Sequence, residues 1–391
     1  MKRLICFFGL LLVGAHSFSQ KPKTKPTTRS LSPAVSEIKV PLTADHWEFE
    51  RGKAEFLEYK GVNAIKLNEN SGFMIYKDLD FSNGTIEFDV EVNQANPFST
   101  IYFRWQSKNE TEHVYLRTAV AAIKNSVAAV QYASIINGVN TWDLQYEFQS
   151  AADIKIGEWN HVKLVVSGKQ LRVFINYAPT PNLEIPCMEG NTSEGKIGIG
   201  TGFTGQSIFA NLVVRPNETE GLSAQPGADL TMHDTRYIRN WQVSDPAALP
   251  SGQELNAFML PKPGTNWEAI TAERRGLVNL SRKFGNSQSR RFVWLRAKIK
   301  SDSSQTLNLK MGFSDEIWVF MNRKPIYVDE NIYSGMRKNP DARISLDNCF
   351  FPIHLVKGEN ELLVGIANDF YGWGIMARLD NLEGIEILNY E

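Results

Sequence analysis

The sequence has little cysteine, no long uninterrupted apolar segment and almost no net charge. Only 3 of its 391 residues are cysteines, so a disulfide framework does not hold this fold together. Apart from Cys6, the chain has Cys187 and Cys349, which could pair in an oxidising compartment; two buried thiols are the favoured interpretation. The formal net charge of −1 excludes a general attraction to nucleic acid.

The N-terminal segment has the pattern of a secretory signal peptide. Lys2 and Arg3 precede an apolar run at 4–13, and the small residues Ser17 and Ser19 suit a cleavage site. We therefore expect residues 1–19 to be removed and the product to be exported to the periplasm or the extracellular space. No later segment approaches the length of about 18 apolar residues needed to span a bilayer, so membrane insertion is not expected.

Signatures of several enzyme classes are also missing. There is no G-x-S-x-G nucleophile turn, and the histidines show no metal-binding spacing. Residues 200–205, GTGFTG, match G-x-G-x-x-G, but a β-rich run follows them instead of a helix, which excludes a dinucleotide site. We expect no cofactor and no metal site, although a structural calcium ion would be compatible with the expected domains.

The most regular part of the chain is 81–117, which contains three strand-like segments with alternating side chains. One set is apolar and is predicted to face a core: Ile86, Phe88, Val90, Ile101, Phe103, Trp105, Val114 and Leu116. The opposite set is mostly polar: Glu87, Asp89, Glu91, Tyr102, Arg104, Gln106, His113, Tyr115 and Arg117. This period of two predicts a sheet with one core face and one polar face.

The same strand pattern extends over two domains. Residues 20–35 are expected to be a flexible linker, 36–215 a first β domain, 216–232 a second linker and 233–391 a second β domain. Residues 316–321 and 361–367 are apolar on both faces, as in the central strands of a sandwich. We predict an all-β protein of two tandem β-sandwich (jelly-roll) domains.

Both domains resemble known folds. Residues 81–88, 159–163 and 209–212 of the first domain resemble a laminin-G-like, concanavalin A-like jelly roll. Residues 312–324, 355–363 and 371–374 resemble the galactose-binding-like β-sandwich found in carbohydrate-active proteins. Together these resemblances imply a carbohydrate-associated protein, while neither implies a specific ligand.

The segment 87–91, EFDVE, is similar to the E-x-D-x-E strand of laminarinase-type retaining glycosidases. That resemblance implies Glu87 as the nucleophile, Asp89 as its modulator and Glu91 as the acid/base. However, four residues along a strand span roughly 13 Å. Retaining carboxyl groups lie about 5–5.5 Å apart. A solvated sheet face is the simpler interpretation.

A binding interpretation uses the same polar face. Tyr102, Arg104, Tyr115 and Arg117 would lie beside Glu87 and offer flat rings and charged hydrogen-bond donors to a sugar, with Trp142 and Gln145 at the border. The alternative is a set of cross-strand ion pairs that only keep an exposed sheet soluble.

A second group of candidates lies near the C-terminus of the second domain. In it, Asp369, Tyr371 and Trp373 would bind a ligand or, alternatively, close the end of the sandwich or the contact between the domains.

The leading hypothesis is a secreted, non-catalytic glycan-binding or accessory protein whose partner is a glycan or polysaccharide. The first alternative is a retaining glycoside hydrolase that uses Glu87 and Glu91. The second is a structural or protein-interaction module.

Overall fold

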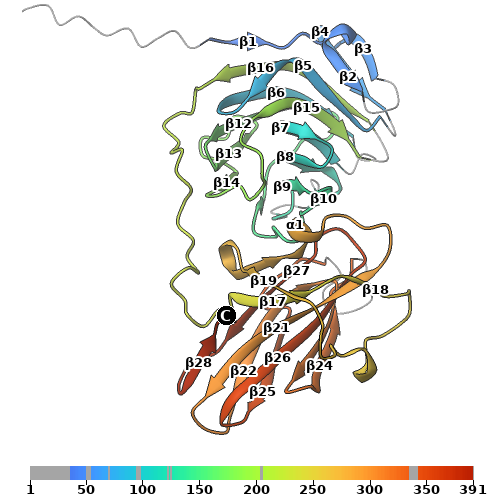
Figure 1. Cartoon of the computed structure of the whole chain (residues 1–391). Coiled ribbons are helices and arrows are strands. Elements are labelled where there is room, and N and C mark those ends of the chain that lie inside the picture. Colours follow the sequence, from blue (N-terminus) through green and yellow to red (C-terminus); the bar gives the residue numbers. More distant parts are fainter. Residues whose placement is uncertain are drawn as a thin grey trace, which may run out of the picture. The chain divides into compact units, whose positions relative to one another are not determined.

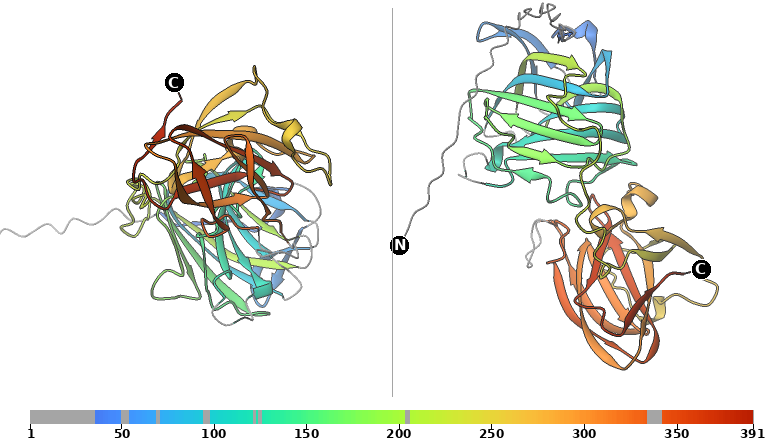
Figure 2. Two further views of the ribbon diagram at one scale, coloured as in Figure 1. Left: turned by 90° about the horizontal axis from the view of Figure 1, so that it is seen from below. Right: turned by 90° about the vertical axis from the view of Figure 1, so that its left-hand side faces the viewer.

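The computed structural model describes residues 36–49, 54–68, 71–93, 98–120, 123, 126–202, 206–333 and 342–390. The expected signal peptide and first linker, 1–35, lie outside the described residues. Ser36–Glu391 is one compact unit and is built almost entirely of strands, which confirms the predicted all-β class (Figure 1 and Figure 2). No helix among the described residues is long and apolar enough to cross a membrane.

The first sandwich contains two sheets. One has the order β14-β13-β12-β6-β16-β4-β3 with β1 beside β16, and the other has the order β10-β9-β8-β7-β15-β5-β2 with β11 beside β9. The strands of the first sheet are β1 (Ile38–Lys39), β3 (Ala54–Tyr59), β4 (Val62–Leu67), β6 (Gly84–Val92), β12 (Trp159–Ser167), β13 (Gln170–Ile175), β14 (Leu183–Ile185) and β16 (Ser207–Pro216). Those of the second are β2 (Trp47–Phe49), β5 (Phe73–Phe81), β7 (Phe98–Ser107), β8 (Glu110–Arg117), β9 (Val130–Ile136), β10 (Val139–Asn140), β11 (Gln149–Ser150) and β15 (Gly195–Thr201), and the 3₁₀ turns are η1 (Ala44–His46) and η2 (Thr118–Val120).

The apolar side chains of both sheets meet in one core, as the alternation predicts. Seven of the eight residues expected to face it are members of the core: Ile86, Phe88, Val90, Ile101, Phe103, Val114 and Leu116. The exception is Trp105. The pairing of β7 with β8 shifts between Phe103 and Ser107, and Arg104 has a φ of 51°, so a bulge turns the following side chain to the other face.

The second sandwich also contains two sheets. Their orders are β19-β17-β21-β26-β23-β24, with β18 and β28 beside β21, and β20-β27-β22-β25. The strands are β17 (Asn240–Ser244), β18 (Ala247–Ala248), β19 (Trp267–Thr271), β20 (Leu277–Asn279), β21 (Arg291–Ser301), β22 (Gln305–Ser314), β23 (Glu316–Met321), β24 (Lys324–Glu330), β25 (Cys349–Leu355), β26 (Gly358–Asn368), β27 (Gly374–Leu379) and β28 (Ile385–Leu388). The short helices are η3 (Ala257–Met259), η4 (Arg274–Gly276) and α1 (Leu280–Phe284).

The strands predicted to be buried on both faces are central in this sandwich. β26 lies between β21 and β23, and β23 lies between β26 and β24. One face of this sheet packs into the sandwich core, and a second apolar cluster with Trp294 and Trp318 covers the other face. The double-sided apolar pattern is therefore explained by two separate layers of packing.

The segment that joins the sandwiches contacts the first one closely. The amide of Gly227 donates to the carbonyl of Pro186 at 2.7 Å. A Cβ at Gly168, where φ is 54°, would lie 1.9 Å from the carbonyl oxygen of Ala224. Only glycine therefore permits this approach of the segment to the β12–β13 turn.

Candidate functional site

The three carboxylates of β6 lie side by side on the outward face of their sheet, and ion pairs and hydrogen bonds already engage them. Arg215 Nη1 donates to Glu87 at 2.9 Å. Tyr59 Oη and Lys60 Nζ donate to Glu91 at 2.9 and 2.5 Å. This arrangement fits the interpretation of a solvated face with cross-strand partners.

Asp89 is the most constrained of the three. Its Oδ1 lies 2.8 Å from His161 Nδ1, and its Oδ2 accepts a hydrogen bond from Asn211 Nδ2 at 2.7 Å. Burial acts to raise the pKa of Asp89, but the hydrogen bonds from His161 and Asn211 outweigh it and lower the pKa below its usual value. Asp89 is therefore ionised at neutral pH and cannot donate a proton there.

The expectation that Glu87 shares one face with the candidates on the next two strands is wrong. β6 pairs with β12 and β16, whereas β7 and β8 belong to the opposite sheet. Consecutive strands in a jelly roll can cross from one sheet to the other. Glu87 and Asp89 therefore face away from Tyr102, Tyr115 and Arg117.

The expectation that Arg104 lies on an exposed polar face is also wrong. It is 1% exposed, and burial lowers its pKa. Its guanidinium donates to the carbonyl of Ser82 at 2.8 and 2.6 Å and to the carbonyl of Gly168 at 2.8 Å. Arg104 thus ties the β5–β6 turn to the β12–β13 turn.

Aromatic rings follow one another across the outward face of the second sheet. We call Phe73, Trp105, Tyr102, His113, Tyr115 and Trp142 the aromatic strip. Ring centroids are 4.2 Å apart for Phe73 and Trp105, 5.5 Å for Trp105 and Tyr102, 5.6 Å for Tyr102 and His113, and 5.7 Å for His113 and Tyr115. Tyr115 and Trp142 belong to one apolar cluster with Ala133. The bulge at Arg104 is what brings Trp105 into this row.

Two polar side chains accompany the strip. Arg117 Nη2 donates to Gln131 Oε1 at 3.0 Å and to Tyr115 Oη at 3.3 Å. Its guanidinium also lies 5.6 Å from the centre of the Tyr115 ring. Burial raises the pKa of Tyr115 to about 12, so its hydroxyl stays protonated and can hydrogen-bond.

His113 is the buried titratable group of the strip. It is 3% exposed, and burial lowers its pKa to about 3, so the imidazole is neutral at physiological pH. Within the part of the chain that the structure describes, its Nδ1 has no hydrogen-bond partner. The sequence marks His113 only as one member of an alternating face, and burial is what distinguishes it.

The candidates of the second sandwich separate into three environments. Trp373 is fully buried in the core of that sandwich, so the expectation that it stacks on a ligand is wrong. Asp369 is exposed, and its amide donates to Asp315 Oδ2 at 2.7 Å. Tyr371 is 41% exposed and lies edge-on to Trp142, with centroids 6.2 Å apart. Tyr371 thus extends the aromatic strip.

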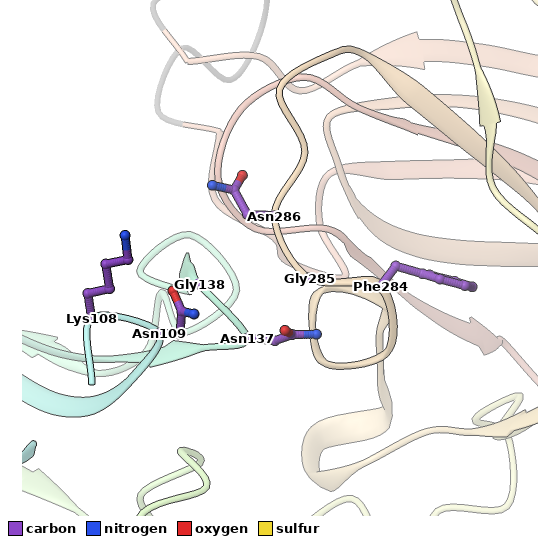
Figure 3. A pocket seen from close by; sticks show the side chains of 7 residues that line it. All are labelled: Lys108, Asn109, Asn137, Gly138, Phe284, Gly285 and Asn286. Carbon is purple, nitrogen blue, oxygen red and sulfur yellow. The ribbon is translucent and has the colours of Figure 1, made fainter. Parts of the chain in front are cut away.

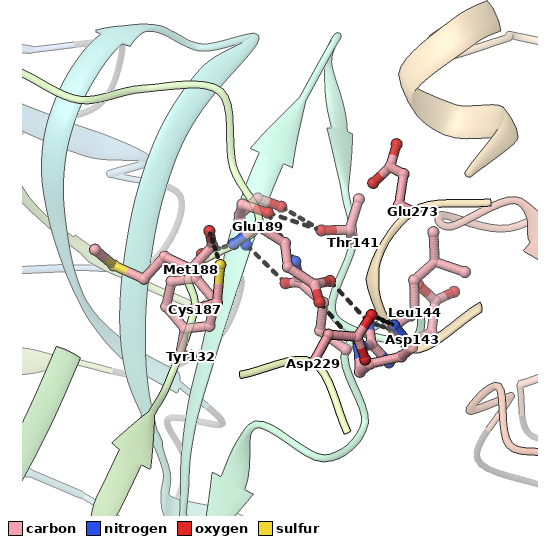
Figure 4. A network of polar contacts seen from close by, with 12 residues as sticks. Tyr132, Thr141, Asp143, Leu144, Cys187, Met188, Glu189, Asp229 and Glu273 are labelled. Atoms are coloured by element: carbon pink, nitrogen blue, oxygen red, sulfur yellow. Dashed lines mark hydrogen bonds and ion pairs between the residues drawn. The ribbon is translucent and has the colours of Figure 1, made fainter. Parts of the chain in front are cut away.

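Both sandwiches contribute to a buried network near Trp142. Glu189 accepts two hydrogen bonds from Arg275, at 2.9 and 2.7 Å, and Asp143 accepts hydrogen bonds from Gly372 and Leu144 (Figure 4 shows Asp143, Leu144 and Glu189). Burial and the negative charge of Asp315 raise the pKa of Asp143 well above its usual value. Gln145, expected at the border of the site, is instead buried against Ser134.

Neither of two cavities found among the described residues includes a predicted ligand-binding residue. One, of about 420 Å³, is lined by Lys108, Asn109, Asn137, Gly138, Phe284, Gly285 and Asn286 (Figure 3). The other, of about 410 Å³, includes Arg275, Asp229 and Cys187. In the second cavity Arg275 is paired with Glu189, and Asp229 with Thr231.

The described residues form neither a candidate metal site nor a disulfide. They contain no group of three or more His, Cys, Asp or Glu side chains placed to hold a metal ion. Cys187 and Cys349 are both buried and do not form a disulfide.

Comparison with protein families gives a match over most of the first sandwich. Residues 42–215 match the 3-keto-alpha-glucoside-1,2-lyase-like domain. This match supports the expected carbohydrate-related jelly-roll domain. The galactose-binding-like character of the second domain remains a prediction. No curated protein matches the chain.

Several solved structures are distantly similar. Carbohydrate-binding module CBM66 from Bacillus subtilis is 14% identical, with a TM-score of 0.34 over 43% of this chain and 95% of that one. A putative glycosyl hydrolase from Parabacteroides distasonis is 14% identical, with a TM-score of 0.33 over 46% and 99%. Domain 4 of the arabinanase AbnA from Geobacillus stearothermophilus, in complex with arabinotriose, is 13% identical, with a TM-score of 0.29 over 46% and 82%. At these identities and TM-scores, nothing about the activity of this chain follows.

Proposed function

We propose that the protein is an exported carbohydrate-binding protein that holds a glycan on the aromatic strip. The observation that carries this proposal is the row of rings on the face of the sheet opposite the core, accompanied by Arg117 and Gln131. The family match of residues 42–215 supports a sugar as the ligand.

The chemistry of the strip suits a sugar. A pyranose has an apolar C–H face that packs on a ring and a rim of hydroxyls that needs donors and acceptors. Tyr102 and Phe73 are partly exposed rings, and Arg117 is a partly exposed donor beside Tyr115. The carboxylates of β6, by contrast, are already paired and lie on the other sheet.

Binding can be followed by tryptophan fluorescence, because Trp105 and Trp142 both belong to the strip. The full chain is titrated with plant, algal and host polysaccharides and with gluco-oligosaccharides. We expect a saturable change for at least one glycan and a loss of affinity of roughly three- to tenfold in Tyr102→Ala.

The matched control is Tyr177→Ala, which removes a ring that is 77% exposed and stacked on His161, beside the opposite sheet. This variant should bind like the wild type. No response of the wild type to any glycan, or equal losses in both variants, would contradict the proposal. In that case capture of a protein partner would favour the structural or interaction module.

A second candidate function is elimination across C1 and C2 of a 3-keto-α-glucoside, and the family match favours it. In such a step a base takes the C2 proton, which the neighbouring ketone makes acidic, while the C1–O bond breaks. Burial lowers the pKa of His113, the imidazole of the strip, to about 3, so His113 is too weak a base for this proton and is not assigned to the step.

The test of the second function is release of the leaving sugar from a 3-keto-α-disaccharide. Release by the wild type would establish this function, and no release would contradict it.

A further inference from the structure

The second sandwich reaches the aromatic strip through the loop between β26 and β27. Phe370 packs on the apolar cluster of Tyr115, Ala133 and Trp142, and Tyr371 lies edge-on to Trp142. Phe370 and Tyr371 also contact each other, with centroids 4.4 Å apart. The row of rings therefore continues from the first sandwich into the second.

Two buried carboxylates, one from each sandwich, hold this loop. Asp315 Oδ2 accepts hydrogen bonds from the amides of Asp369 and Phe370 at 2.7 and 2.8 Å. Asp143 of the first sandwich accepts the amide of Gly372 at 3.2 Å on Oδ1 and 3.0 Å on Oδ2. Amides bonded to buried carboxylates have fixed positions, so the rings between them are preorganised.

The close fit at Gly372 shows how tightly the loop is seated. A Cβ there would lie 2.2 Å from Asp143 Oδ1 and 2.6 Å from Leu144 Cγ. Any other residue here would require the side chains of Asp143 and Leu144 to shift. The position of Tyr371 relative to Trp142 therefore depends on the contact of the Gly372 backbone with these two side chains.

The rings at the second-sandwich end of the row are more exposed to solvent than Trp142 is. Tyr371 is 41% exposed and Tyr333 is 51% exposed, whereas Trp142 is 8% exposed. Tyr333 stacks on Phe370 with centroids 5.4 Å apart and an interplanar angle of 11°. A sugar chain that extends along the strip past Trp142 would meet Tyr371 next.

We propose that Tyr371 forms the far end of the glycan site and determines the length of sugar chain that the protein prefers. The second sandwich then completes the site of the first and is not a separate binding module. This inference rests on the proposed function, because it needs a sugar bound on the strip.

The experiment measures affinity for α- and β-linked gluco-oligosaccharides of increasing length, from one unit to six, with the full chain. For the wild type we expect affinity to rise with length. Tyr371→Ala should bind the shortest sugars as the wild type does and lose roughly three- to tenfold for the longest. Tyr371→Phe, which keeps the ring, should restore the preference for long sugars.

Two further variants separate this inference from the proposed function. Tyr102→Ala should weaken binding at every length, because its ring lies in the first part of the strip, and Tyr177→Ala should change nothing. A wild type that binds none of the glycans, polysaccharides included, overturns both proposals. A wild type that binds, with Tyr371→Ala showing no loss or the same loss at all lengths, overturns only the role of Tyr371.

Discussion

Asp143 and Gly372 are 229 residues apart in the chain, and the Asp143 carboxylate accepts the Gly372 amide on both oxygens. The bond joins the first sandwich to the loop that carries Tyr371. Because burial favours the protonated carboxyl, the attachment depends on an acceptor oxygen more than on a charge.

Replacing Asp143 should therefore show whether the attachment of the loop depends on a hydrogen-bond acceptor or on a negative charge. Asp143→Asn keeps a carbonyl acceptor, and we expect it to lower the free energy of unfolding by less than about 1 kcal/mol. Asp143→Ala leaves the Gly372 amide unpaired and should cost about 1–3 kcal/mol. Urea unfolding measures both, and hydrogen exchange at Gly372 should quicken in the alanine variant alone. Equal losses in the two variants would show that charge matters instead.

Asp315 predicts a pH dependence of stability. Burial raises its pKa from 3.8 to about 7, so the folded protein holds this proton more tightly than the unfolded chain does. The contribution to stability is therefore complete below about pH 4 and is lost as the pH rises to about 7.

The asparagine in Asp315→Asn cannot ionise, so this variant lacks that pH dependence. Its free energy of unfolding should therefore rise relative to that of the wild type as the pH increases from about 4 to about 7. Urea unfolding midpoints at matched pH measure this difference. A constant difference between the two proteins from pH 4 to pH 8 would contradict the assignment.

Arg104 should be important for stability and not for binding. Arg104→Ala removes the donor for the carbonyls of Ser82 and Gly168 in a buried place, and we expect a loss of about 3 kcal/mol. Arg104→Lys keeps the charge without the forked geometry and should lose less. Thermal or urea unfolding gives the values. The glycan affinity of the folded Arg104→Lys variant should equal that of the wild type. A loss of affinity without a loss of stability would show that Arg104 contributes to binding.

The paired carboxylates of β6 predict a mild effect of Glu87→Gln. This change weakens the ion pair with Arg215 at a partly exposed position and should cost less than about 1 kcal/mol. Binding on the aromatic strip should not change, since Glu87 lies on the other sheet. The hydrolase alternative makes the opposite prediction: reducing-sugar release from a β-glucan by the wild type, abolished in a folded Glu87→Gln variant.

Cys187 and Cys349 should behave as buried thiols. In the native protein, without reductant, we expect neither to react with a thiol reagent within minutes, and both to react once the chain is unfolded in urea. Peptide mapping identifies the labelled sites. Labelling that requires prior reduction would reveal a disulfide and contradict the structure.

The sequence by itself determined which side chains of 81–117 face the core, with the exception of Trp105. The alternation in 81–117 identified seven core residues of the first sandwich, and the doubly apolar 316–321 and 361–367 identified central strands. These properties are local, because a period of two places neighbouring side chains on opposite faces whatever lies beside the strand.

Only the tertiary structure decided which strands are neighbours, and hence where the candidate site lies. Glu87 and Tyr102 are on consecutive strands but in different sheets, and the bulge at Arg104 exchanges the faces of Arg104 and Trp105. The contact of Tyr371 with Trp142 depends on hydrogen bonds between residues more than 200 positions apart. Such pairings follow from how two cores and a buried carboxylate fit together, and no pattern along a single strand encodes them.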